Sequence, residues 1–250
     1  MRTEASDSAP QAHGGIFATT HWSVVLAATG QASPEAAAAL ERLCETYWYP
    51  LYAYVRHRGQ SPEDSKDLTQ EFFHRLLHGN YLARVDPRKG QFRSFLLAAM
   101  NHFLANEWDR ARTLKRGGQV TFLSLDQLQA ERRYQCEDSA GRSPEEIYEK
   151  TWVLALLDKV LERLREETAA GHLARFEELK AVLMGERPTL TYAEIAFKLD
   201  TTEPALKVTM QRLRRRYAEL LREQIAHTIP DPHGTEDELR HLYRVLSAER

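Results

Sequence analysis

Apolar residues recur at helical spacing along most of the chain, and no stretch shows the strict alternation of a half-buried strand. The pattern predicts one helix that begins at Pro34 and another over 62–77, each preceded by a serine that can cap it. Pro50 is expected to break or kink the first of these helices. A further helix over 91–111 is apolar almost all round as far as Leu104, which is typical of a central, buried helix.

The same start signals recur in the second half of the chain. A Ser-Pro-Glu-Glu sequence opens a helix at 143–164, and another helix is predicted over 173–184. The capping box at 191–194 opens a short helix, and the turn at 200–202 leads into a second one, which is helix-turn-helix spacing. A further capping box, at 235–238, predicts a helix close to the C-terminus.

These elements predict an all-α fold with two small helical domains joined by a flexible linker. Residues 1–18 lack any period and are expected to be a disordered lead. The first domain is placed at 19–116, and the linker at 117–142, where two glycines are followed by a mixture of charges and short apolar pieces. The second domain, with the helix-turn-helix, is placed at 143–225, and 226–250 is a C-terminal extension with a short helix.

The composition is that of a soluble globular protein, with 42% hydrophobic and 28% charged residues among 250. No apolar run is long enough to span a membrane, and the first residues do not form a secretion signal, so a cytoplasmic location without membrane attachment is expected. Cys44 and Cys136 are far apart and indicate neither a disulfide framework nor a zinc ribbon. The net charge of −2 does not by itself suggest nucleic acid, so the local charge distribution has to decide.

Two local clusters of basic and polar residues are candidates for nucleic-acid contact. In the second helix of the helix-turn-helix, apolar residues from Leu206 to Leu220 share one face, so Lys, Gln and Arg side chains project from the other. The central helix ends in a basic stretch at 110–116, next to Trp108 and several polar residues, which favours contact with single-stranded or duplex DNA. The alternative in both places is a solvated helix face.

Four ordered motifs resemble the extracytoplasmic-function (ECF) branch of the bacterial sigma factors. They are Thr-Tyr-Trp-Tyr-Pro-Leu-Tyr at 46–52, Glu-Asp-Ser-Lys-Asp-Leu-Thr-Gln-Glu-Phe-Phe at 63–73, Phe-Arg-Ser-Phe-Leu-Leu at 92–97, and the helix-turn-helix at 191–216. The resemblance implies an initiation factor that binds RNA polymerase core and directs it to promoters. Its first domain would melt the minus-10 element, and its second would read the minus-35 element.

The resemblance also implies partners and site residues. The partners are the β′ clamp helices and the β subunit of the core, together with promoter DNA, and an anti-sigma factor is left open. The polymerase-binding residues would be Asp64, Asp67, Gln70, Glu71 and Phe73. The minus-10 residues would be Arg88, Lys89, Asn101, His102, Asn106, Arg110 and Arg112. The minus-35 residues would be Glu203, Ala205, Lys207, Val208, Gln211, Arg212 and Arg215.

Two other functional classes are alternatives to this interpretation. The Glu-x-x-His pairs at 71–74 and 238–241 resemble those of di-iron helical bundles, but a di-iron site needs two further glutamates from other helices. No nucleophile elbow or phosphate-binding glycine loop is present, so we expect no enzyme activity, no cofactor and no metal. A helix-turn-helix regulator that binds operator DNA directly remains the alternative, although it leaves the acidic helix and the apolar central helix unexplained.

Overall fold

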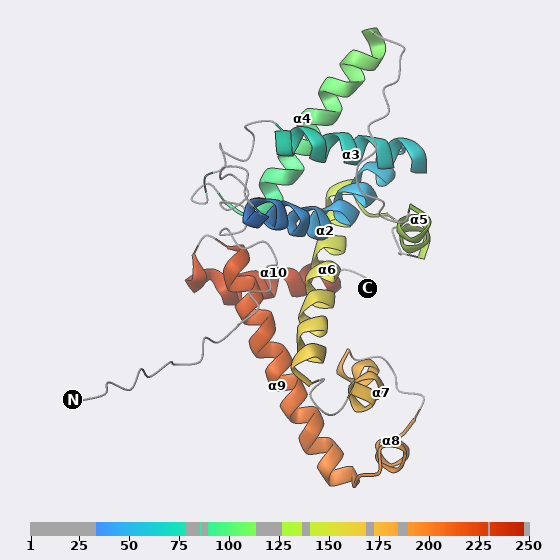
Figure 1. Cartoon of the computed structure of the whole chain (residues 1–250), viewed down its shortest axis with the longest axis vertical. Helices are drawn as coiled ribbons and strands as arrows, with labels where there is room; N and C mark the ends of the chain where they lie inside the picture. Colours follow the sequence, from blue (N-terminus) through green and yellow to red (C-terminus); the bar gives the residue numbers. More distant parts are fainter. Residues whose placement is uncertain are drawn as a thin grey trace, which may run out of the picture.

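A computed structural model describes residues 34–78, 86, 90–113, 127–136, 141–168, 173–184, 190–229 and 231–247. All regular elements in these ranges are helices, so the predicted all-α fold class is confirmed. The helices are α2 (Pro34–His57), α3 (Pro62–His78), α4 (Phe92–Thr113), α5 (Gln127–Cys136), α6 (Pro144–Thr168), α7 (Leu173–Leu183), α8 (Tyr192–Lys198), α9 (Glu203–Thr228), the 3-10 turn η3 (Pro232–Gly234) and α10 (Thr235–Ser247) (Figure 1). None of the helices in the described ranges is long and apolar enough to cross a membrane. The predicted lead at 1–18 lies outside the described residues.

Pro50 was expected to break or kink the first helix. Helix α2 continues through Pro50, so the predicted break does not occur. A proline inside a helix removes one backbone hydrogen bond and costs about 3 kcal/mol. The buried face of α2 offsets this cost, because it places large aromatic side chains in the core on both sides of Pro50. Tyr47, Trp48 and Tyr52 are each at most 2% exposed, and the rings of Trp48 and Tyr52 stack with 5.1 Å between centroids.

The long helix α6 contributes to two hydrophobic cores. Its N-terminal half, with Tyr148 and Trp152, packs into the core formed with α2, α3 and α4. Its C-terminal half, with Val160 and Leu164, packs against α7 and α9. The predicted second domain begins with α6. Its first helix is therefore part of the hydrophobic core of the predicted first domain. The division of the chain into domains stays a prediction.

Helix α5 lies inside the range predicted as a linker and is attached to α2. Arg56 forms an ion pair with Glu131 at 2.9 Å, and the Tyr52 hydroxyl donates a hydrogen bond to the same carboxylate at 2.6 Å. The hydrogen bond from Arg56 is the main reason that the pKa of Glu131 is lowered to about 2. Ala130 enters the core beside these contacts. No local pattern predicted this anchoring, and residues 117–126 and 137–140 lie outside the described ranges.

The first residues of α4 carry a buried arginine that ties three helices together. Arg93, with 3% of its side chain exposed, forms ion pairs with Glu238 of α10 at 2.6 Å and with Glu149 of α6 at 3.3 Å. Its guanidinium lies 4.3 Å from the ring centroid of Trp152. Gln91 donates a further hydrogen bond to Glu238 at 2.8 Å. We refer to these five residues as the Arg93 cluster.

The Arg93 cluster gives Glu238 a role that the sequence did not predict. The capping box at 235–238 predicted that this carboxylate would serve the start of its own helix, but its contacts with Arg93 and Gln91 turn it toward α4. The chain reaches α10 through η3, in which the Gly234 amide donates to the Asp231 carbonyl at 3.0 Å. Helix α10 then lays Leu242 into the core that α2 and α6 share.

We predict that Glu238→Gln lowers the free energy of unfolding by about 3 kcal/mol, because it leaves the buried Arg93 with one carboxylate partner instead of two. The value is at the lower end of the range for a broken buried pair because Glu149 remains. The matched control is Glu236→Gln, since Glu236 lies on the same helix in an exposed pair with Arg222 at 2.8 Å. That change should cost less than about 1 kcal/mol. Equal urea denaturation midpoints for the two variants would contradict the structural importance of the Arg93 cluster.

Candidate nucleic-acid interface

Helices α8 and α9 follow one another across a tight turn with capped helix starts. Glu194 accepts a hydrogen bond from the Thr191 amide at 2.7 Å, and the Thr191 hydroxyl accepts one from the Glu194 amide at 3.3 Å, so the predicted capping box is present. Asp200 has φ of 48°, in the left-handed region that aspartate tolerates in turns. The Thr202 hydroxyl then caps α9 by accepting from the Ala205 amide at 3.4 Å.

The first turns of α9 are held by one face and open on the other. Leu206 and Met210 are buried against Ile195 of α8 and Leu179 of α7. Because a helix turns about 100° per residue, this packing fixes which side chains point away from the protein. All seven predicted minus-35 residues lie on α9, and the structure leaves Ala205, Lys207, Val208, Gln211, Arg212 and Arg215 exposed, with Glu203 partly exposed.

The charged residues of this open face have only weak partners within the protein. Lys207 pairs with Glu203 one turn earlier at 2.6 Å, which raises the lysine pKa. Arg215, 79% exposed, lies 3.6 Å from Glu219. Exposed pairs of this kind contribute little to stability, so both cations can exchange these partners for phosphates at low cost.

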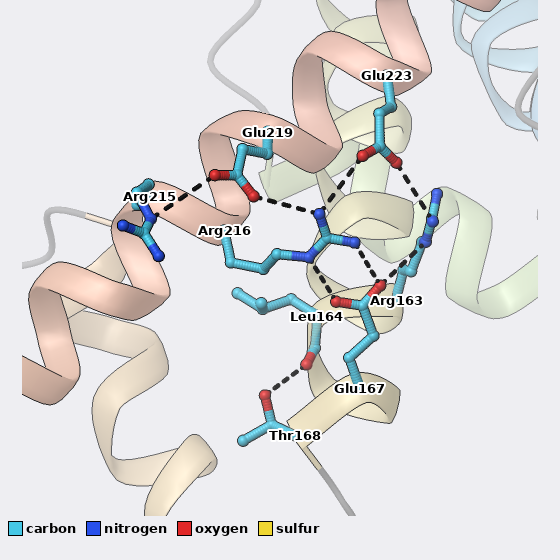
Figure 2. A network of polar contacts seen from close by, with 8 residues as sticks. All are labelled: Arg163, Leu164, Glu167, Thr168, Arg215, Arg216, Glu219 and Glu223. Atoms are coloured by element: carbon cyan, nitrogen blue, oxygen red, sulfur yellow. Dashed lines mark hydrogen bonds and ion pairs between the residues drawn. The ribbon is translucent and has the colours of Figure 1, made fainter.

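The next arginine along α9 has a different role. Arg216 makes a two-pronged contact with Glu167 of α6, at 2.8 and 2.9 Å, and also reaches Glu219 and Glu223 (Figure 2). Arg163 of α6 completes the network through Glu167 at 3.4 Å and Glu223 at 3.3 Å. The hydrogen bond from Arg216 is the largest cause of the lowered pKa of Glu167. This network joins α9 to α6 just beyond the open face.

A second open site lies between α3 and α4. It is a cavity of about 410 Å³, lined by Phe72, Arg75, Leu76, Phe95, Ala98, Ala99, His102, Phe103 and Asn106. Its walls are largely aromatic and aliphatic, and the exposed side chains of His102 and Asn106 bring polar groups to it. Arg75 lies 5.0 Å from the ring centroid of Phe103 and pairs with Glu71 and Glu107, each at 2.7 Å. A small planar group could stack on these rings and meet hydrogen-bonding partners at the edge.

The structure divides the predicted minus-10 residues between two faces of α4. Asn101 faces α2, where its side-chain oxygen accepts hydrogen bonds from the Tyr54 hydroxyl at 2.5 Å and from Arg58 at 2.6 Å. Arg58 in turn lies 4.8 Å from the ring centroid of Trp108. The structure therefore brings His102 and Asn106 together and assigns Asn101 to a separate polar contact. Arg88 and Lys89, and the side chains of Arg110 and Arg112, lie outside the described residues.

The predicted polymerase-binding residues of α3 differ in exposure. Asp64 and Asp67 are exposed, and Asp64 exchanges hydrogen bonds with Ser61 at the start of the helix. Gln70 is partly buried, as is Glu71, which is paired with Arg75. Phe73 is only 3% exposed and packs edge-on against Phe72, so its side chain supports the helix from the core.

Sequence reasoning missed Arg75 and Arg58 as members of these sites. Arg75 stands outside any run of basic residues, and Arg58 belongs to the short basic stretch at 56–58, which was not among the predicted sites. Only the packing of the helices brings these two arginines beside Phe103 and Trp108. The stripe of Phe95, Ala99, His102 and Asn106 at helical spacing was a signal that could have indicated the cavity. In the part of the chain that the structure describes, no group of three or more His, Cys, Asp or Glu side chains could hold a metal ion.

The chain matches a model of a known protein family. The family model described as ECF sigma factor matches residues 31–223, which is more than half of the chain. The match includes both open sites and ends within α9, so α10 lies beyond it. No curated protein and no solved structure matches the chain significantly.

We predict that Arg216→Ala lowers the free energy of unfolding at pH 7 by about 1–2 kcal/mol, through loss of charge-assisted hydrogen bonds at a partly exposed site. The control, Arg215→Ala, should change it by less than about 0.5 kcal/mol. The folded protein lowers the pKa of Glu167 below its ordinary value of 4.5. The ion pair of Glu167 with Arg216 therefore stabilises the fold fully above pH 4.5, and this stabilisation is lost as the pH falls through the lowered pKa. Urea denaturation at pH 7 and at pH 4 measures the free energy of unfolding of both variants. If the free-energy difference between Arg216→Ala and Arg215→Ala were larger at pH 4 than at pH 7, the stabilising role of the Arg216–Glu167 pair would be contradicted.

Proposed function

Since the chain belongs to the ECF sigma factor family, we propose that it binds RNA polymerase core through the exposed carboxylates of α3, reads the minus-35 duplex with the open face of α9, and holds the melted minus-10 strand at the cavity between α3 and α4. In this proposal the protein is not itself an enzyme, because the polymerase carries out the chemistry. The cytoplasm, where transcription takes place, is its site of action.

The observation that carries the proposal is the open face of α9. Helix-turn-helix proteins place the N-terminal part of their second helix in the major groove, where side chains meet base edges. In this chain Gln211 and Arg212 are exposed within the first turns of that helix, and these residue types make two-pronged contacts with adenine and guanine respectively. Arg215 lies one turn further along, where a phosphate contact would add affinity without selectivity.

The cavity between α3 and α4 supports the minus-10 part of the proposal. Bases that leave the helical stack are commonly held between aromatic side chains and recognised at their polar edges. Phe72 and Phe103 supply apolar walls, and His102 and Asn106 supply hydrogen-bonding groups. A volume of about 410 Å³ is within the usual range of small-ligand pockets and is large enough for one base.

The core-binding part of the proposal rests on charge. Asp64 and Asp67 lie one helical turn apart and are both exposed, so they can meet a basic surface on the polymerase. Glu71 shares their face by helical spacing but is held by Arg75, which also lines the cavity. Core binding and the minus-10 site are therefore adjacent on α3.

We expect the double change Asp64→Lys and Asp67→Lys to weaken binding to core polymerase more than about tenfold, because two attractive contacts become repulsive. Calorimetry or fluorescence titration with purified core measures the effect, and circular dichroism checks that helix content is unchanged. The matched control reverses Glu162 and Glu166, two exposed carboxylates one turn apart on α6. Core affinity that is unchanged, or reduced equally by the control, would place the core-binding face elsewhere.

The minus-35 part is tested by run-off transcription from a library with a randomised minus-35 element. Gln211→Ala and Arg212→Ala should each change the preferred base at one or two positions, since a two-pronged base contact is worth about 1–3 kcal/mol of discrimination. Arg215→Ala should lower initiation from all sequences and reduce the slope of its salt dependence by about 1. Arg222→Ala, on the same helix but paired with Glu236, is the control with parental behaviour. If every variant keeps the parental preference, α9 does not read the promoter.

A further inference from the structure

The open face of α9 contains an apolar side chain that the packing of the protein does not use. Val208 is 47% exposed, although valine is most often buried. It lies about 200° around the helix from Leu206, which faces the core. An isolated exposed valine is common on protein surfaces, so its exposure alone indicates nothing. Its position among the candidate base-reading residues is what distinguishes it.

The neighbours of Val208 are the residues expected to contact bases. At a spacing of three and four residues along the helix lie Gln211 and Arg212, and Arg215 follows one turn later, all of them exposed. Ala205, one turn earlier, is exposed as well and extends the apolar surface toward the N-terminus of the helix. A polar helix face inserted in the major groove would thus carry an apolar patch of Ala205 and Val208 near its centre.

We propose that Val208 recognises thymine in the minus-35 duplex by packing against its 5-methyl group. The inference rests on the proposed function and adds a specificity-determining residue to it. The thymine methyl is the one methyl group that the standard base pairs present in the major groove, and cytosine, the other pyrimidine, carries only a hydrogen at the same carbon. Val208 therefore selects for A·T pairs beside the bases that Gln211 and Arg212 contact, through burial of apolar surface without a hydrogen bond.

The test removes the methyl group from the DNA and its partner from the protein. The template carries the minus-35 sequence that the wild-type holoenzyme selects from a randomised library. Each thymine of either strand is then replaced singly by uracil, which lacks only the 5-methyl group. Run-off initiation is compared for the wild type, Val208→Ala and the control Lys207→Ala. Alanine is a strong helix former at an exposed position, so Val208→Ala should keep its fold, which circular dichroism checks.

At one uracil position we expect the wild-type holoenzyme to lose about three- to fivefold in initiation, the effect of burying roughly one methyl group. Val208→Ala should lose a similar factor on the thymine template and nothing further with uracil at that position, whereas Lys207→Ala should keep the full uracil penalty. The inference is overturned if the selected element contains no thymine in either strand, or if every uracil penalty is the same for the wild type and Val208→Ala. Initiation that does not depend on the minus-35 sequence at all would instead remove the reading role of α9, and the inference with it.

Discussion

The arrangement of the helices depends on one buried arginine. Arg93 has almost no access to water, and a charge in that position is tolerated only when carboxylates compensate for its lost hydration. Those carboxylates come from Glu149 of α6 and Glu238 of α10, so both helices must be in place for the first core to close. The Tyr148 hydroxyl adds a hydrogen bond to the Arg93 carbonyl at 3.0 Å, which ties the backbone of α4 to α6 as well. These polar contacts have defined partners, so they add a constraint on the register of α4 against α6 and α10 to that of the apolar packing.

Two long helices connect this core to the open face of α9. Helix α6 runs from the first core to α7, and α9 lies beside it (Figure 1). The C-terminal end of α9 lies near α10. The first turns of α9 lie at the opposite end of the molecule from the tip of α4. The Arg216–Glu167 contact joins the C-terminal end of α6 to the middle of α9 (Figure 2). Arg216, which holds α9 against α6, is thus not one of the residues that we propose to contact DNA, and Arg215 meets this network only at Glu219. This separation allows Arg215 and Val208 to change without loss of the fold, and it makes Arg216 a structural residue despite its place in a basic run.

Local signals predicted the parts of the structure that depend on local physics. Serine and threonine caps and first-turn prolines predicted the starts of α3, α6 and α8, and the turn at 200–202 predicted the start of α9. The spacing of Leu206 and Met210 identified the buried face of α9. The features that sequence reasoning missed all arise from contacts between distant segments. Helix α5 is held by Glu131 against Arg56, 75 residues away, and Glu238 meets Gln91 from 147 residues along the chain. The burial of Phe73, the inward orientation of Asn101 and the membership of Arg75 in the cavity likewise depend on how α2, α3 and α4 pack, which helical periodicity does not specify.

We propose that this chain acts on DNA as part of a polymerase and opens the duplex that it helps to select. Permanganate reactivity measures this directly, because it modifies unpaired thymines. Genomic promoter fragments are treated with core polymerase alone, the chain alone, and both together. We expect a short cluster of reactive thymines, at a fixed distance upstream of the transcription start, only when both proteins are present. A duplex that the chain alone protects, with no reactive thymines whether or not core is added, would contradict the account and identify a regulator that binds operator DNA directly.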